Sequence, residues 1–206
     1  MLKAQNIYLC PGDGGPLCLD PATSEMWDNG KYLFFKSTQK HISSDDPTKL
    51  WKSWVNPYPI VLIEDGLAEN DWEGWAHLTR VLGNNIELVG DDIFCTNKRI
   101  LQKAIEEEVA NSILIKLNQI GTLTETLETI ELARAHGYNC FVSHRSGETM
   151  DSFIVDLTVA TGAGRLKTGS SCRGERIEKF NQLMRIEQML GSSARFAGKT
   201  TFKNIK

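Results

Sequence analysis

Short apolar segments of the chain repeatedly run into a polar or charged residue that could take part in chemistry. The residues that follow these segments are Asp20, Glu64, Asp91, Lys116, His144, Arg145, Ser146 and Lys167. Three carboxylates would repel one another unless a hard dication lay between them, and Mg²⁺ takes carboxylate oxygens together with water and substrate oxygens. A lysine near bound cations has a lowered pKa and can act as a base. The set therefore indicates metal-assisted removal of a proton next to a carboxylate.

The segments that carry these residues have the pattern of strands, and the stretches between them have helical periodicity. Strands are expected at 17–19, 59–63, 86–90, 113–115, 140–143 and 165–166, and helices at 49–55, 71–82, 98–109, 122–135, 150–160 and 173–190. Strands that are almost continuously apolar are typical of a parallel sheet whose outer face is covered. When each strand delivers a functional group at its C-terminal end, the pattern is that of a (β/α) barrel active site.

The expected fold is α/β, an incomplete TIM-type (β/α) barrel of about six strand–helix units. A closed barrel of this type has eight strands, and residues 1–15 are too few to supply two further units. We expect three regions: an irregular N-terminal segment, 1–15; the barrel portion, 16–191; and a loose, polar and basic tail, 192–206. Such a sheet would leave two edges and an apolar interior exposed, which favours association or poor solubility.

Composition and charge exclude several classes of protein. The 206 residues include 41% hydrophobic and 24% charged side chains, which is enough for a sizeable core and argues against disorder. The net charge of −3 comes without a long run of either sign, so neither nucleic acid nor a membrane surface is expected as a partner. No apolar stretch approaches the ~18 residues of a membrane span, and the N-terminus lacks a signal peptide. Five scattered cysteines without a CxxC pair indicate free thiols and a cytoplasmic location.

Several segments, in this order along the chain, resemble the enolase family. The most specific strings are LNQIGT at 117–122 and SHRSGET at 143–149, and the resemblance runs from about residue 16 to residue 191 without a break. The other matching segments are LDPATSE at 19–25, YPIV at 58–61, IEDGL at 63–67, LVGDD at 88–92, LKTG at 166–169, CRGER at 172–176 and KFNQL at 179–183. The resemblance implies a glycolytic lyase, phosphopyruvate hydratase, that dehydrates 2-phosphoglycerate to phosphoenolpyruvate with Mg²⁺.

The resemblance also implies roles for the residues at the strand ends. Asp20, Glu64 and Asp91 match the family's metal-binding carboxylates, and Glu64 and Asp91 also lie near the substrate in such enzymes. Lys116 resembles the general base that removes the C2 proton of the substrate, and it contacts the substrate. The other implied substrate contacts are His144, Arg145, Ser146 and Lys167.

Physical chemistry is consistent with these implied roles. Arg145 can hold a phosphate by a bidentate fork, with a further donor from Ser146. Lys167 resembles the residue that pairs with the substrate carboxylate. Asp65 and Asp92 stand next to metal ligands, and because alternate residues of a strand face opposite ways, we expect them to support the site rather than bind the metal.

The chain departs from the family pattern in several places. The resemblance covers only the C-terminal portion of such an enzyme, without the N-terminal capping domain and two further barrel strands, and no residue is matched to the acid that protonates the leaving hydroxide. The string GDGG at 12–15 faintly resembles a family loop, but its position predicts a turn. Met150 and Arg165 replace an acidic residue and a glutamine at positions that carry no chemistry in the family.

Three hypotheses stay open. The first is an enolase-type lyase whose partner is a small phosphorylated substrate, acting as a homodimer or with a missing N-terminal half supplied by a companion chain. The second is a catalytically incompetent enolase fragment that serves as a binding or structural protein, or a truncated reading frame. The third, another member of the wider superfamily acting on a different acid, is disfavoured by the SHRSGET string. Dehydration by the isolated chain is not expected, because loss of a general acid typically costs ~10²–10⁴-fold.

Overall fold

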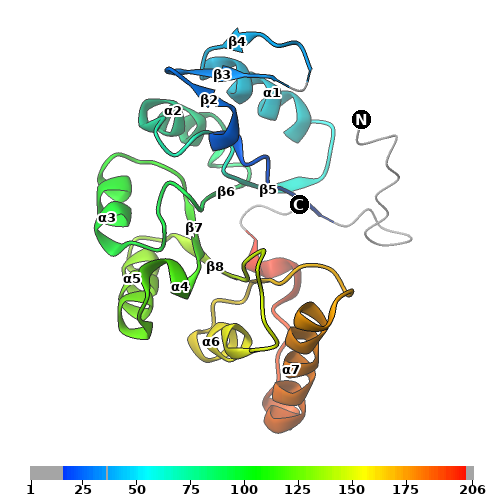
Figure 1. Ribbon diagram of the computed structural model, residues 1–206. Helices are drawn as coiled ribbons and strands as arrows, with labels where there is room; N and C mark the ends of the chain where they lie inside the picture. Colours follow the sequence, from blue (N-terminus) through cyan, green and yellow to red (C-terminus); the bar gives the residue numbers. More distant parts are fainter. Residues whose placement is uncertain (1–15, 36, 203–206) are drawn as a thin grey trace.

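The computed structural model describes residues 16–35 and 37–202, so the predicted N-terminal segment, 1–15, which includes Asp13, lies outside the described residues. Its main element is a sheet of six parallel strands in the order β1-β5-β6-β7-β8-β9 (Figure 1). The strands are β1 (Leu17–Leu19), β5 (Ile60–Glu64), β6 (Glu87–Gly90), β7 (Ser112–Ile115), β8 (Asn139–Ser143) and β9 (Leu166–Lys167). The sheet curls into a half-barrel, and this confirms the expected incomplete TIM-type barrel.

Helices connect the strands and are arranged along the outer side of the curved sheet (Figure 1). They are α1 (Asp45–Val55), α2 (Trp72–Leu82), α3 (Lys98–Glu106), α4 (Leu117–Ile120), α5 (Leu123–Ala135), α6 (Phe153–Thr161) and α7 (Gly174–Leu190). All six predicted helices are present, and the short helix α4 was not predicted. Side-chain caps fix three of the starts, because Asp71, Asn97 and Thr122 accept hydrogen bonds from the first backbone N–H groups of α2, α3 and α5.

Three helix bounds differ from the prediction by three residues or more. Helix α1, expected at 49–55, already begins at Asp45. The other two differences have local reasons. Helix α3 ends at Glu106 rather than at residue 109, and the backbone just beyond it turns left-handed at Glu108, with φ of 56°. Helix α6 starts at Phe153, three residues later than predicted, because the carboxylate of Asp151 accepts the Phe153 N–H at 2.8 Å and holds the chain in a turn. Neither the end of α3 nor the start of α6 is marked in the sequence by a break in the apolar periodicity.

A small antiparallel sheet lies between β1 and α1 and was not predicted. It consists of β2 (Trp27–Asp28), β3 (Lys31–Leu33) and β4 (His41–Ile42). Tyr32 anchors it: this side chain is fully buried, its hydroxyl donates to Asp71 at 2.7 Å, and the same oxygen accepts the Ala68 N–H at 2.9 Å. Strands of two or three residues are too short to show an alternating pattern, so tertiary contacts define them.

The two faces of the six-stranded sheet carry separate sets of apolar side chains. Ile63, Ile113 and Val142 belong to the large core shared with the helices. A second cluster consists of Val61, Leu62, Val89, Leu114 and Phe141. We call this second cluster the inner cluster, because Leu62, Leu114 and Phe141 line the inner face of the sheet. Along β6, β7 and β8 the two sets alternate with the two-residue period of a strand, whereas on β5 the consecutive residues Val61 and Leu62 both belong to the inner cluster.

Part of the C-terminal tail covers this inner cluster. Phe202 packs against it, with its ring centroid 6.3 Å from that of Phe141. The guanidinium of Arg165 stacks on both rings, 4.8 Å from the centroid of Phe141 and 5.3 Å from that of Phe202. The expectation of a loose tail is therefore wrong around Phe202, because the open sheet offers this aromatic side chain an apolar surface. Within the described residues, no helix combines the length and the apolar character needed to cross a membrane.

Candidate active site

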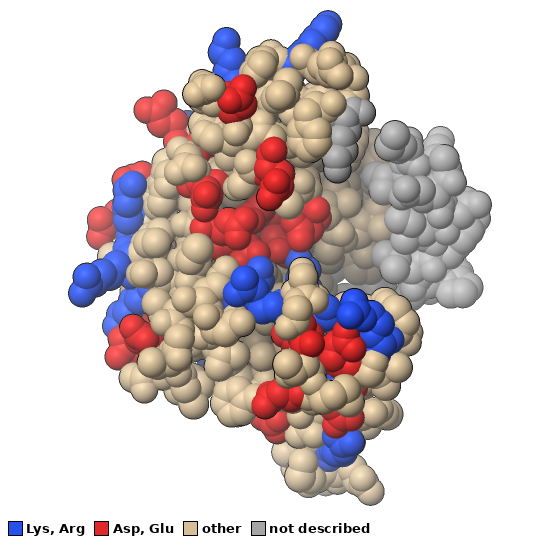
Figure 2. Space-filling model, in the orientation of Figure 1, with Lys and Arg blue, Asp and Glu red and all other residues tan. Residues whose placement is uncertain are grey.

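The polar residues predicted at the strand ends meet at one edge of the sheet. Asp20 follows β1, Glu64 ends β5, Asp91 follows β6, Lys116 follows β7 and Lys167 ends β9. The strands are parallel and neighbouring, so their C-terminal ends lie side by side. Figure 2 shows acidic side chains gathered at the centre of one face of the molecule, with basic side chains beside them.

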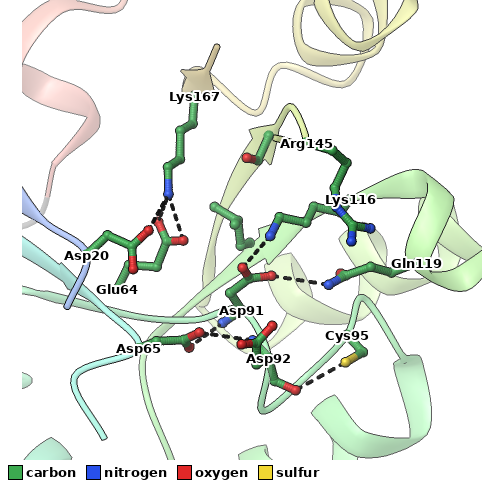
Figure 3. A network of polar contacts seen from close by, with 12 residues as sticks. Asp20, Glu64, Asp65, Asp91, Asp92, Cys95, Lys116, Gln119, Arg145 and Lys167 are labelled. Carbon is green, nitrogen blue, oxygen red and sulfur yellow. Dashed lines mark hydrogen bonds and ion pairs between the residues drawn. The ribbon is translucent and has the colours of Figure 1, made fainter. Parts of the chain in front are cut away.

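Lys167 joins the carboxylates of Asp20 and Glu64. Its Nζ lies 2.9 Å from Asp20 Oδ2 and 2.8 Å from both carboxylate oxygens of Glu64 (Figure 3). Burial raises the pKa of Glu64 to about 7; Lys167 opposes that rise, whereas the negative charges of Asp20 and Asp91 add to it. Burial alone would lower the pKa of Lys167, but the two carboxylates outweigh it and raise that pKa. The local negative charge thus holds Lys167 as an ammonium ion.

Lys116 forms a second ion pair beside the first. Its ammonium contacts Oδ2 of Asp91, whose other oxygen accepts from the amide of Gln119 at 3.3 Å (Figure 3). The Lys116 backbone N–H donates to the Thr96 hydroxyl at 2.8 Å, which fixes the point where the chain leaves β7. Both ion-paired side chains are largely shielded from water. Two lysines from different strand ends therefore reach into one cluster of carboxylates.

Asp65 supports the turn that carries Asp91. Its side chain accepts the backbone N–H of Asp91 at 2.9 Å and that of Asp92 at 3.2 Å, so both of its oxygens are engaged. Its own backbone is left-handed, with φ of 44°, which turns the chain out of β5. Burial raises the pKa of Asp65 to about 7, against the lowering effect of the two hydrogen bonds. These contacts fix the backbone of the turn that carries Asp91, and the supporting role of Asp65 stays a prediction.

The donor set suits a hard divalent cation. Within the described part of the chain, one oxygen each from Asp65, Asp91 and Asp92 comes within 4.8 Å of the others. The predicted ligands Asp20 and Glu64 instead surround the ammonium of Lys167. The excess of carboxylate oxygens, and the raised pKa of Glu64, indicate negative charge that a dication would stabilise. The metal ligands Asp20, Glu64 and Asp91 therefore stay a prediction, and their carboxylate oxygens are of the kind that a hard divalent cation binds.

The loop after β8 carries the predicted phosphate contacts. His144 donates its backbone N–H to the Lys167 carbonyl at 2.9 Å, and Nδ1 of His144 lies 2.7 Å from the same oxygen. Burial is the largest cause that lowers the pKa of His144, which favours the neutral ring. Nη1 of Arg145 donates to Oδ1 of Asn118 at 3.2 Å, so this guanidinium lies over the start of α4, and Ser146 follows it in the loop.

A cavity of about 400 Å³ extends from the charged edge over the inner face of the sheet. Asp20, Glu64 and Lys167 line its charged part. Its apolar lining includes Leu19, Leu62, Leu114, Phe141, Leu166 and Phe202. The tail and the strand ends thus enclose a space of the size that a small molecule occupies.

The sequence did not predict the residues that contact and position the side chains of the candidate site. Thr96 and Gln119 contact Lys116 and Asp91, and Asn118 contacts Arg145. Asn118 and Gln119 belong to the LNQIGT string, so the resemblance had marked their segment but not their contacts. Thr96 follows Cys95 in a left-handed stretch with φ values of 55° and 46°, which no pattern in the sequence indicates.

Comparison with known proteins finds similar sequences over most of the chain. The family model described as "Enolase, C-terminal TIM barrel domain" matches residues 15–205. "Enolase 1" of Chlorobaculum tepidum is 75% identical over 190 residues, which cover 92% of this chain and 44% of that protein. "Enolase 2" of Methanospirillum hungatei is 54% identical over 194 residues, which cover 94% of this chain and 45% of that protein. The chain thus spans less than half the length of these two relatives, and it belongs to the enolase family.

Proposed function

We propose that this chain carries the metal site and the general base of an enolase-type lyase, which dehydrates 2-phosphoglycerate to phosphoenolpyruvate. The observation that supports the proposal most strongly is the meeting of Lys116 and Lys167 with Asp91, Glu64 and Asp20 at one strand-end edge. Two lysines paired with the buried carboxylates of Glu64 and Asp91 are a costly arrangement for a fold, and perturbed groups of this kind cluster at functional sites. The family membership supports the same reaction class.

The metal proposed for this reaction is Mg²⁺, held by Asp20, Glu64 and Asp91. When bound, it would stabilise the negative charge that develops on the substrate carboxylate as the proton leaves. Carboxylate ligands with water and substrate oxygens are what Mg²⁺ prefers. The burial of Glu64 and its raised pKa are consistent with a carboxylate that is more stable beside a cation.

Lys116 is proposed as the base that takes the C2 proton. Its Nζ contacts Asp91, so it stands beside a proposed ligand and at the mouth of the sheet where a small anion can approach. Lys167 is proposed to pair with the substrate carboxylate, because its ammonium is anchored by Glu64 and Asp20 and its pKa is raised. The two lysines therefore have different proposed roles: Lys116 accepts the proton, and Lys167 remains charged.

The phosphate of the substrate is proposed to bind at the loop after β8. Arg145 supplies a guanidinium with parallel N–H donors, which suits a phosphate, and Ser146 adds a further donor. The lowered pKa of His144 favours a neutral ring that can donate or accept a hydrogen bond there. The proton donor to the leaving hydroxide has no proposed residue among the described ranges 16–35 and 37–202.

The test separates a lyase from a binding protein. Residues 1–206 are mixed with Mg²⁺ and 2-phosphoglycerate in D₂O, and the C2 proton and the vinyl protons of phosphoenolpyruvate are followed by NMR. Loss of the C2 proton signal supports the proposal. Binding of 2-phosphoglycerate without exchange supports the second hypothesis, a family member that only binds. Formation of phosphoenolpyruvate would mean that the chain supplies its own acid, and Asp13 is the first residue to replace.

A further inference from the structure

The loop that carries His144, Arg145 and Ser146 rests on two buried cations from the first turns of α7. Arg176 is 8% exposed, and its guanidinium donates to two carbonyls of the loop, to Arg145 O at 2.9 Å and to Ser146 O at 3.1 Å. Both bonds are charge-assisted and reach consecutive peptide units, so they fix the direction of the backbone between them.

The second cation ties the two ends of the same loop together. Lys179 is 0% exposed; its ammonium forms an ion pair with Glu148 and donates to the Thr149 carbonyl at 2.8 Å. Oε1 of Glu148 accepts the backbone N–H of Arg145 at 2.8 Å. Burial alone would raise the pKa of Glu148, but Lys179 and this N–H outweigh it and lower that pKa. Glu148 is therefore an anion, held between the loop and α7.

Arg176 also links this loop to the one that follows β9. A side-chain carbon placed on Gly169 would lie 3.0 Å from Cδ of Arg176, so the arginine stem packs directly on this glycine, whose φ is +80°. The two loops are joined again where the His144 N–H donates to Lys167 O at 2.9 Å. Helix α7 thus supports both the predicted phosphate contacts and the strand end that carries Lys167.

We propose that Glu148, Arg176 and Lys179, named here the α7 clamp, are positioning residues that hold the loop at 144–149 in the geometry that binds the phosphate of an anionic substrate. The proposal rests on the proposed function. A fully buried ammonium is expensive to desolvate, and apolar side chains of the same volume would pack as well. What the charges add is direction, because each bond of the clamp ends on a particular backbone atom of the loop.

The clamp also contributes positive charge behind the loop. Arg176 is among the groups that lower the pKa of His144, so its charge is felt at the ring of a predicted substrate contact. The oxygens that accept its hydrogen bonds, Arg145 O and Ser146 O, belong to neutral carbonyls, so the net charge of Arg176 stays in place. A phosphate on the other side of the loop would be attracted by this charge without touching it.

The test compares Lys179→Met with Glu148→Gln and with a matched control. Lys179→Met keeps the length of the side chain and removes the charge, and Glu148→Gln keeps an acceptor oxygen. The control is Lys98→Met, which breaks the exposed pair with Glu128, whose atoms are 3.1 Å apart. Backbone amide exchange is measured by NMR, and the binding of inorganic phosphate and of Mg²⁺ is measured by calorimetry.

We expect Lys179→Met to speed exchange of the Arg145 N–H by ~10–100-fold, the effect of losing a charge-assisted bond. Exchange in β6 and β7 should be unchanged, phosphate should bind ~10-fold or more weakly, and Mg²⁺ should bind as before. Glu148→Gln should give a smaller change of the same kind, and Lys98→Met none.

Faster exchange throughout the sheet, or equal losses of phosphate and Mg²⁺ affinity, would mean a merely structural role and would overturn the proposal. An unchanged Arg145 amide, or a wild-type chain that binds no phosphate, would overturn it too. The proposed function fails separately: if the C2 proton of 2-phosphoglycerate does not exchange while phosphate affinity still depends on Lys179, the clamp stands and the lyase assignment does not.

Discussion

Lys167 lies 2.8 Å from both carboxylate oxygens of Glu64, although 103 positions separate the two residues in the sequence. Glu64 is almost fully buried, and the same ammonium reaches Asp20 at 2.9 Å. The last strand of the sheet therefore supplies the counter-charge for carboxylates on the first two strands in the sheet order, β1 and β5. An open half-barrel brings these strand ends together because its curvature faces them toward one another.

Replacing Lys167 by methionine should destabilise the fold by leaving Glu64 buried without its cation. The loss of charged hydrogen bonds predicts a decrease of about 1–3 kcal/mol in the free energy of unfolding, at the lower end because Lys167 is partly exposed. Urea unfolding at neutral pH measures it. Lys98→Met, at an exposed pair, should change stability by less than about 1 kcal/mol; equal losses in the two variants would contradict the account.

Arg165 should matter more for stability than Lys167, although it lies outside the chemistry. It pairs with fully buried Glu87 at 3.2 Å and stacks between Phe141 and Phe202. Arg165→Met removes the cation that pairs with the buried Glu87 carboxylate, and breaking a buried pair costs about 3–5 kcal/mol. Guanidinium unfolding checks the value. Ser112 and Asn139 also donate hydrogen bonds to Glu87. If Arg165→Met lowers the free energy of unfolding by less than Lys167→Met does, these two donors are enough to stabilise the buried carboxylate.

Cysteine reactivity should follow burial. Burial raises the pKa of Cys140 to about 11, and the side chain is closed off from water. The thiolate is the reactive form, so at pH 8, below this raised pKa, Cys140 has little thiolate and should not label in the folded protein; the fraction rises only as the pH approaches 11. Cys172 is exposed and should label with a maleimide before Cys140 does. Peptide mass spectrometry gives the order, and early labelling of Cys140 would contradict the fold.

Mg²⁺ should stabilise the folded chain, because a cation that binds only the native state shifts unfolding by mass action. At a concentration of ~100 times its Kd the gain is about 2.7 kcal/mol. Asp91→Asn should remove most of this gain, whereas Asp28→Asn, at a surface pair with His41, should keep it. Thermal unfolding with and without Mg²⁺ measures both. Equal stabilisation of the two variants would remove Asp91 from the metal site.

Most of the fold could be predicted from the sequence, because continuous apolar strands and amphipathic helices follow one another repeatedly along the chain. The sequence did not predict β2, β3 and β4, whose two or three residues show no periodicity and are held by Tyr32. The polar composition of the tail predicted a loose segment. It gave no sign that the aromatic side chain of Phe202 packs on the inner cluster.

The strand-end residues of the candidate site were all named from the sequence, since each follows an apolar run. The contacts that position these residues were not predicted from the sequence. Asp65 was expected to assist, but its hydrogen bonds to the N–H groups of Asp91 and Asp92 depend on a left-handed backbone. Lys179 opens the KFNQL segment that resembles the family, but nothing in that segment indicates that its side chain is buried. The packing of α7 on the loop at 144–149 buries it.

The most direct test of the central claim is exchange of the C2 proton of 2-phosphoglycerate in D₂O with Mg²⁺, comparing wild type, Lys116→Ala and Lys98→Ala. If Lys116 is the base, wild type and Lys98→Ala exchange the proton at the same rate. Lys116→Ala should then lose exchange by at least ~10²-fold, the usual contribution of a positioned base. Its Mg²⁺ affinity should be retained, because Lys116 is not a ligand. Exchange that survives in Lys116→Ala at the wild-type rate would contradict the assignment and move the base to another residue.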